Sequence, residues 1–306
     1  MKRTNAFYAL TATMLIWGFT PVATRFLAMD LPPGDVLVIR YSFCALAFAG
    51  LLTVIGGWRC RLADLPRFLA CAITGVAGYN ITVTYGFQST PASLGGLMLG
   101  TEPAVIAVLA AILLGEALTL PVIAGLVLAS LGTIVLLAGD LALPESVGSA
   151  GMAGPLLVLI SAIAWSFYVV LIKPLLIKYG PVHASALASM IGSPMILGFA
   201  RPETLTTAAG LSASQWIVVG FLAVFGTVVS LFLWNYGNRH VSSASAAAFI
   251  YSVPLVAVVT AVLFLGEQLT MPIVLGGMLI LAGVAIAQFS PQPAVAVKSA
   301  RADSSG

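Results

Sequence analysis

Hydrophobic residues fall into ten long runs along the chain, separated by short polar segments. The runs cover residues 7–28, 35–57, 67–88, 93–114, 120–141, 152–176, 182–199, 215–237, 243–265 and 271–289. A helix that crosses a bilayer needs about 20 apolar residues, roughly twice the length of a membrane-barrel strand. A segment in lipid must also satisfy its own backbone polar groups. The pattern therefore predicts an all-α integral membrane protein with ten transmembrane helices.

An internal repeat relates the runs to one another. Pro103 matches Pro254 at an offset of 151 residues, and the Gly-Glu pair at 115–116 matches the pair at 266–267 at the same offset. Self-similarity at a fixed offset is the sequence signature of repeated architecture. The chain is therefore predicted to consist of two related copies.

The two predicted copies take residues 1–145 and 146–290, with five helices in each. Because five is an odd number, the second copy enters the membrane in the opposite direction to the first. Inverted repeats of this kind are a common plan of secondary transporters, with the substrate site near the bilayer midplane between the copies. Residues 291–306 are rich in Pro, Ala and Ser and are predicted to form a disordered cytoplasmic tail.

The distribution of positive charge predicts the orientation. With the N-terminus inside the cell, ten Lys and Arg residues lie in cytoplasmic segments and three lie on the outer side. Membrane proteins carry an excess of Lys and Arg on the cytoplasmic side. We therefore expect a multi-pass protein of the cell (inner) membrane with both termini in the cytoplasm.

The amino-acid composition limits the kinds of molecule that the protein is expected to bind. The chain is 60% hydrophobic and 8% charged, whereas a soluble domain is roughly 45–50% apolar and about 25% charged. The lipid bilayer is thus the expected surrounding, and charges confined to short loops exclude a nucleic-acid partner. The three cysteines have no metal or redox spacing. We expect no metal and no cofactor, and a chain that functions as a monomer with a small-molecule substrate.

Glu102 is the acidic residue placed deepest in the predicted membrane. It lies nine residues inside the run 93–114, which is about 13 Å at ~1.5 Å per residue. A carboxylate at this depth is costly and is functional by default. Two functional roles are open, a proton carrier and a receptor for a substrate ammonium group. Two structural roles are open as well, a pair with Arg40 and a bond to the backbone beside Pro103.

Aromatic and polar residues are predicted at similar depth. Trp17 matches Trp165 at an offset of 148 residues, and both lie near the middle of their runs. Tryptophan usually lies at membrane interfaces, so this pair either forms the walls of a cavity for an aromatic or cationic ligand or fills the helix bundle. The candidate substrate-binding set is completed by Tyr79, Asn80, Tyr168 and Tyr251.

Pro103 and Pro254 are predicted to interrupt their helices. Each lacks the N–H that would bond to the carbonyl four residues earlier, Leu99 and Ile250 respectively. A freed carbonyl near the midplane either contributes to a gate or binding site or reflects a kink that only serves packing. Their equivalent positions in an inverted pair favour a gate or helix break at the site.

Glu116 and Glu267 each follow a glycine and precede a new apolar run. Carboxylates in this position bond to N–H groups of loops or helix starts. We expect a structural and not a catalytic role for both.

The residues named above carry a family resemblance. Two inverted sets of five helices, the Thr-Glu-Pro stretch at 101–103 and Gly-Glu-x-Leu-Thr at 115–119 and 266–270 resemble the EamA-type branch of the drug/metabolite transporter superfamily. The resemblance implies a carrier of small metabolites, often an exporter of amino acids, with possible coupling to a proton gradient. One branch exports aromatic amino acids, and the aromatic residues expected at depth here are similar to it.

The predicted function is a secondary active transporter that works by alternating access and exports small metabolites such as amino acids. The alternative is a carrier of phosphorylated or nucleotide-linked metabolites, for which only Arg40 supplies a positive charge near the site. A remote alternative is an intramembrane enzyme. An enzyme would need a nucleophile with a base, or a metal cluster, at depth, and no such motif occurs in the sequence.

Overall fold

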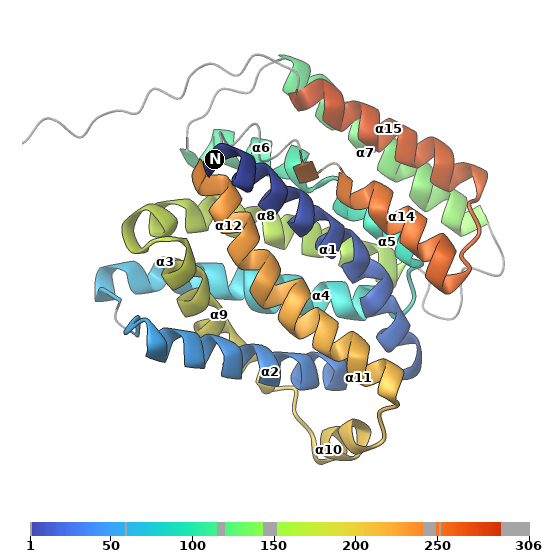
Figure 1. Cartoon of the computed structure of the whole chain (residues 1–306). Coiled ribbons are helices and arrows are strands. Elements are labelled where there is room, and N and C mark those ends of the chain that lie inside the picture. The colour runs from blue at the N-terminus through green and yellow to red at the C-terminus, as the bar shows by residue number, and fades with distance from the viewer. Residues whose placement is uncertain are drawn as a thin grey trace, which may run out of the picture.

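The computed structural model describes residues 2–58, 60–114, 120–142, 152–240, 249–250 and 252–288. Within these ranges the chain is helical and contains no strand (Figure 1). The first half contains α1 (Lys2–Asp30), α2 (Pro33–Val54), η1 (Leu62–Asp64), α3 (Leu65–Cys71), η2 (Ala72–Gly78), α4 (Tyr79–Gly86), α5 (Ala92–Leu99), α6 (Glu102–Leu114) and α7 (Leu120–Ala142). The second half contains α8 (Ala153–Tyr179), α9 (Pro181–Leu197), α10 (Pro202–Ala209), α11 (Ala213–Gly220), η3 (Phe221–Val229), α12 (Ser230–His240), α14 (Ser252–Leu265) and α15 (Met271–Gln288).

Six helical segments are long and apolar enough to cross a membrane by length and composition. A bent pair, α9 with α10, makes up to seven if it counts as one span, and its axis turns by 103°. Shorter apolar helices occur at Ile123–Val135, Ser252–Leu265 and Met271–Gly283. Helical residues thus occur in each of the ten predicted runs, and α10 was not predicted. The boundary near residue 145 and the tail 291–306 lie outside the described residues.

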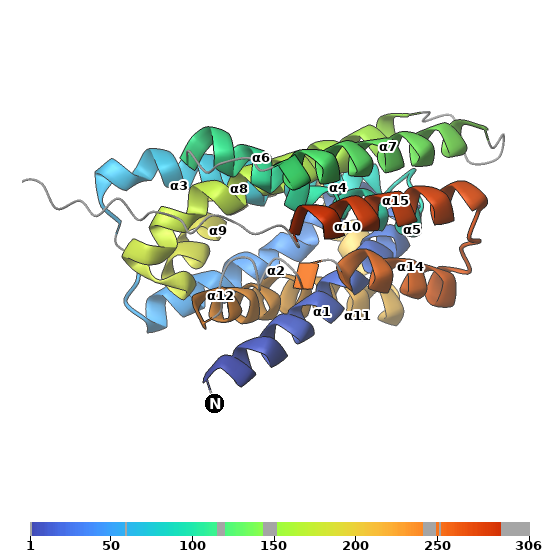
Figure 2. The ribbon, with the colours of Figure 1, turned by 90° about the horizontal axis from the view of Figure 1, so that it is seen from above.

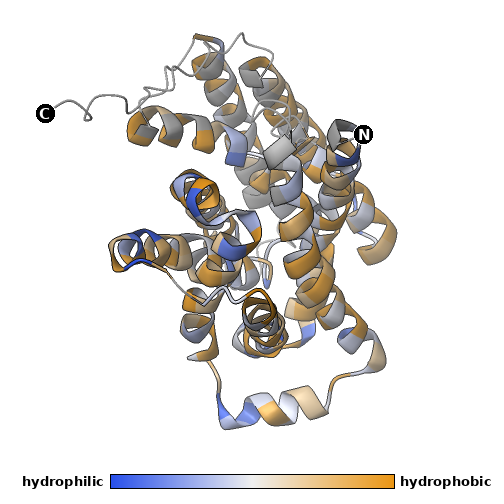
Figure 3. Cartoon of the chain, turned by 60° about the vertical axis from the view of Figure 1, so that its left-hand side comes forward, coloured by the Kyte–Doolittle hydropathy of each residue, from blue (hydrophilic) through white to orange (hydrophobic). Residues whose placement is uncertain are grey.

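The outer surface of the helices is strongly apolar. Side chains such as Leu46, Ile112 and Ile177 are 72%, 70% and 89% exposed. Figure 3 shows hydrophobic residues along the helices and hydrophilic ones at the start of α10, at the bottom of the view. An apolar surface of this extent is incompatible with water and matches the interior of a bilayer.

Helices of the first half pack mainly against helices of the second. α1 packs against α12 and α14, α8 packs against α4 and α6, and α2 packs against α9. α7 and α15 lie side by side at the edge of the molecule in both Figure 1 and Figure 2. The two halves therefore share one helix bundle.

The helices contain three interruptions, of which only the one beside Pro103 was predicted. η2 and η3 are π-helical turns, and they contain Gly75 and Gly226, which match at the offset of 151 residues. The third interruption separates α5 from α6 at Gly100 and Thr101, whose N–H groups bond only three residues back, to Leu97 and Met98 at 3.0 and 3.1 Å. Pro103 has no N–H for the Leu99 carbonyl, so the helix restarts at Glu102. Irregular turns in membrane helices commonly lie at functional sites.

Candidate functional site

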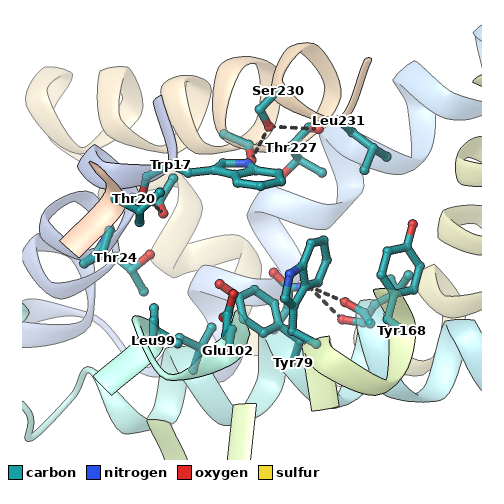
Figure 4. A pocket seen from close by; sticks show the side chains of 18 of the residues that line it. Trp17, Thr20, Thr24, Tyr79, Leu99, Glu102, Tyr168, Thr227, Ser230 and Leu231 are labelled. Atoms are coloured by element: carbon teal, nitrogen blue, oxygen red, sulfur yellow. Dashed lines mark hydrogen bonds between the residues drawn. The ribbon is translucent and has the colours of Figure 1, made fainter. Parts of the chain in front are cut away.

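A partly open cavity of about 120 Å³ lies between the two halves (Figure 4). All three helix interruptions contribute residues to its lining. Its wall includes Gly75 of η2, Thr227 of η3 and Gly100 at the break before α6. A π-helical turn or a helix break leaves backbone carbonyls without their usual partners, and such groups are tolerated within a membrane only where protein or a polar cavity surrounds them. The cavity is therefore the candidate substrate site.

Most of the residues singled out from the sequence meet at this cavity. The lining includes Trp17, Tyr79, Asn80, Glu102, Trp165, Tyr168 and Pro254. Pro103 is buried next to Glu102 but does not line the cavity. Tyr251 lies outside the described residues. The predicted set therefore comes together from both halves, with Pro103 acting behind the wall through the helix break.

Glu102 is the first residue of α6 and lines the cavity while remaining only 8% exposed. In the part of the chain that the structure describes, its carboxylate has no hydrogen bond and no ion pair. The Ser166 hydroxyl donates to the backbone oxygen of Glu102 at 3.3 Å and joins α8 to this turn. The N-terminal end of a helix favours negative charge, so the break before α6 provides a place for a carboxylate at depth.

Among the described residues, Glu102 takes neither of the structural roles considered for it. Arg40 does not pair with it, because the Nη2 of Arg40 donates instead to the Thr227 hydroxyl at 2.7 Å. Among the described residues the carboxylate has no bond to the backbone beside Pro103 either. Arg40 is itself only 8% exposed and lines the cavity. The sequence placed Arg40 near the outer end of its helix, as the one positive charge within reach of the site.

Aromatic rings form a continuous wall. The Trp17 and Trp165 rings meet edge to face with centroids 5.8 Å apart. Trp165 lies 5.3 Å from Tyr79 and stacks on Tyr168 at 4.9 Å. Trp17 also packs 5.3 Å from Trp234, which sequence reasoning did not select. The predicted pair is thus in contact across the two halves, and it provides ring faces for an apolar or cationic group.

Two glycines allow the helices behind this wall to approach. A Cβ on Gly75 would lie 2.2 Å from Cγ of Tyr168, and a Cβ on Gly100 would lie 2.8 Å from Cγ of Pro254. Pro254 itself lines the cavity. These close approaches place α8 against η2 and α14 against the α5–α6 break.

The amide of Asn80 supports the π-helical turn beside it. Its Nδ2 donates to the Val76 carbonyl at 2.8 Å and to the Gly75 carbonyl at 3.4 Å. These are carbonyls of η2, where the regular bonding pattern of an α-helix is interrupted. Asn80 therefore lines the cavity and stabilises its wall at the same time.

Hydroxyl groups of the lining were missed by the sequence reasoning. Thr20 and Thr24 of α1 lie on one side of the cavity, and Thr227 and Ser230 lie beside Trp17 (Figure 4). Single Ser and Thr residues in apolar helices are common and carry no distinctive pattern. The usable signal was the match between Gly75 and Gly226, which points to Thr227 as the next residue.

A polar latch outside the cavity joins the two halves. The Glu267 carboxylate accepts bonds from the backbone N–H groups of Ala92 and Ser93 at 2.6 and 2.9 Å and from the Ser93 hydroxyl at 2.6 Å. Arg25 lies close enough to Glu267 for electrostatic attraction and donates to the Phe87 carbonyl at 2.8 Å. The prediction that Glu267 bonds to N–H groups at a helix start is confirmed. Glu116 lies outside the described residues.

No group of three or more His, Cys, Asp or Glu side chains that could hold a metal ion occurs in the described ranges. Among the described residues, Asp35 is the third buried charged side chain beside Glu102 and Arg40, and it accepts bonds from Thr204 and Thr207 of α10 at 2.6 and 2.8 Å. It also pairs with Arg201 at 3.2 Å. Asp35 therefore fastens α10 to α2 and does not face the cavity.

Known proteins of similar sequence are transporters. An uncharacterized transporter of Archaeoglobus fulgidus is 27% identical, over 90% of this chain and 96% of the relative. A probable terminal-alkyne amino-acid exporter of Streptantibioticus cattleyicolor is 29% identical, over 93% of each chain. The uncharacterized inner membrane transporter YedA of Escherichia coli is 28% identical, over 86% of this chain and 84% of the relative. A solved crystal structure with 19% identity shares the fold, with a TM-score of 0.62 over 93% of this chain and 96% of the other.

A family model describes nearly the whole chain. The EamA-like transporter family matches twice, at residues 5–138 and 152–289, so the chain contains two repeats of one family domain. These matches and the apolar helices identify a multi-pass membrane transporter for a small molecule, not an enzyme. The chain belongs to the EamA-like transporter family.

Proposed function

We propose that the protein is a secondary active transporter that exports a small metabolite, with amino acids as the favoured class, by alternating access. The observation that carries the proposal is the buried carboxylate of Glu102, which has no partner among the described residues and lies in a cavity walled by Trp and Tyr rings. A cavity of this kind suits an organic cation or an ammonium group. The exporter of Streptantibioticus cattleyicolor supports the substrate class, because its name refers to an amino acid.

The proposed architecture has ten transmembrane helices in two inverted copies, residues 1–145 and 146–290. The six long spans, the bent pair and the three shorter apolar helices together make ten. The packing is reciprocal, since α1 contacts α12 and α14 just as its repeat mate α8 contacts α4 and α6. Reciprocal contacts between equivalent helices are those of a pseudo-two-fold axis, and for inverted repeats of transporters this axis lies in the membrane plane.

In this proposal both termini lie in the cytoplasm of a cell (inner) membrane, because ten of the thirteen Lys and Arg residues then lie on the cytoplasmic side. A monomer suffices, because both halves of the cavity come from one chain. Rocking of one copy against the other would open the cavity to each side in turn.

Glu102 also provides a means of coupling to a proton gradient. One carboxylate can bind a proton or a substrate ammonium group, and each occupant excludes the other. Substrate would leave the cell while a proton enters, with no step in which both are carried together. This exchange requires no group other than Glu102.

Phosphorylated or nucleotide-linked metabolites remain the second candidate. The observation in their favour is Arg40, a buried cation in the cavity wall. The Glu102 carboxylate would repel a phosphate in the same cavity. Amino acids are therefore preferred.

The test is a counterflow experiment with the purified chain in proteoliposomes. We expect entry of labelled amino acid when an unlabelled one is trapped inside, and loss of this exchange in Glu102→Gln. Glu203→Gln is the matched control, because Glu203 is exposed and lies on α10. Counterflow of phosphate esters without counterflow of any amino acid would overturn the proposed substrate class.

A further inference from the structure

Arg40 is a second buried charge in the cavity, and its guanidinium is only partly satisfied. Nη2 donates to Thr227, the guanidinium carbon lies 5.5 Å from the centre of the Tyr41 ring, and Nε is buried without a hydrogen-bond partner. Neither ion pair found among the described residues involves Arg40. A buried cation without a carboxylate is costly in a membrane, where such groups face a partner, a cavity or a substrate pathway.

The cation is held in place from the second half of the chain. Thr227 lies in the π-helical turn η3, and its hydroxyl accepts from Arg40 while donating to the Leu222 carbonyl at 2.9 Å. Both hydroxyl interactions are therefore fixed, and the donor of Arg40 points to a defined place. Thr227 is a positioning residue for the guanidinium.

The two unpaired charges lie on different sides of one cavity. In Figure 4 Thr227, which binds Arg40, lies beside Trp17, while Glu102 and Tyr79 lie across the open space from it. The Tyr79 side chain is near enough to interact electrostatically with both Glu102 and Arg40. The charges do not form an ion pair with each other, so each is available to an occupant of the space between them.

Only one kind of small solute satisfies both charges. A simple amine would neutralise Glu102 and leave Arg40 without a counter-charge, and a phosphate or carboxylate alone would do the reverse. A zwitterion supplies an ammonium group and a carboxylate together, and a guanidinium binds a carboxylate through two N–H groups. Its remaining side chain would then lie against the wall of Trp17, Trp165 and Tyr168.

We propose that Arg40 is the carboxylate-binding residue of the site and that Glu102 is its ammonium-binding counterpart, so that the protein recognises free, zwitterionic amino acids. This inference rests on the proposed function and specifies how the substrate is recognised. The site rejects amides, esters and simple amines, because these leave the buried Arg40 without a carboxylate. It also rejects deaminated acids, which leave Glu102 unpaired.

The test compares pairs of ligands on the same purified protein. The probes are L-phenylalanine and L-leucine, their amides, which lack the carboxylate, and the corresponding deaminated acids. We expect the wild type to bind the amino acid at least about 30-fold more tightly than either analogue, since one unpaired buried charge has a cost of that size. Binding is measured by displacement of labelled amino acid.

Each variant should abolish one preference and keep the other. Arg40→Gln should remove the preference for the amino acid over its amide and keep the preference over the deaminated acid. Glu102→Gln should remove the preference over the deaminated acid and keep the preference over the amide. Arg40→Lys should restore part of the first preference, and Arg67→Gln, which changes an exposed arginine of α3, should alter neither. Thr227→Val should weaken the preference for the amino acid over its amide without removing a charge. This variant provides the test if Arg40→Gln does not fold.

The results separate this inference from the proposed function. Wild-type protein that transports amino acids but binds the amides equally well, or an Arg40→Gln variant that keeps the full preference, would overturn the inference and leave the proposed function standing. Wild-type protein that transports neither amino acid would overturn both.

Discussion

A methyl group added at Gly75 should distort the cavity wall. The Cβ of Gly75→Ala would lie 2.2, 2.3 and 2.6 Å from Cγ, Cδ2 and Cβ of Tyr168. Because Cβ is close to the backbone of α8, rotation of the ring alone cannot relieve the overlap. The helices must separate or Tyr168 must leave its rotamer, at a cost of roughly 1–3 kcal/mol for overpacking. Loss of the Trp165–Tyr168 stack adds about 0.5–1.5 kcal/mol.

The assay is thermal unfolding of purified protein in detergent, combined with amino-acid binding. We expect Gly75→Ala to unfold several degrees below the wild type and to bind substrate about 10-fold more weakly, because the displaced ring belongs to the wall. Gly220→Ala is the matched control, since no atom lies within 4 Å of its added Cβ and its φ of −59° is ordinary for a helix. Equal stability and affinity of wild type and Gly75→Ala would refute the close packing of Tyr168 on η2.

Three further outcomes are expected. Glu267→Gln removes the negative charge that joins the α14–α15 connection to the start of α5 and should lower stability by roughly 1–3 kcal/mol; an unchanged unfolding midpoint would count against the latch. Trp17→Ala and Trp165→Ala should each weaken substrate binding about 10-fold while leaving membrane insertion intact, whereas a loss confined to stability would make the pair a packing element only. A cysteine at Ala209 of α10 should react with an impermeant maleimide on intact cells while native Cys60 should not, and the reverse labelling would overturn the orientation.

The hydrophobic pattern predicted much of the architecture because the membrane itself constrains it. A run such as 152–176 has only one stable form in lipid, and it became α8. The internal repeat predicted part of the site. Its offset relates Trp17 to Trp165, and the two rings are in contact in the structure. The position of Glu102 along its helix also identified it as a candidate, because carboxylates are rare near the middle of a bilayer.

The π-helical turns and the partner of Arg40 could not be predicted from the sequence because they depend on tertiary structure. π-helical and α-helical turns have the same composition, so the matched glycines are the one sequence signal at η2 and η3. The sequence predicted Arg40 near the site, but it did not give Thr227 as the partner of its guanidinium. Arg40 donates to Thr227, 187 residues away in the sequence, and a contact of that range cannot be read from local pattern. The split of the run 93–114 was predicted because Pro103 marks it, whereas the packing of Pro254 against Gly100 is a tertiary contact that local pattern does not show.

The most direct test of the central claim is amino-acid flux through proteoliposomes driven by an imposed pH gradient, measured for the wild type and for Glu102→Gln. If Glu102 binds proton and ammonium alternately, the wild type should accumulate labelled amino acid on the more acidic side, against its own concentration gradient. Glu102→Gln should lose both this driven flux and exchange at zero gradient, while Glu203→Gln keeps both. Glu102→Gln with wild-type flux and an unchanged response to the gradient would contradict the account.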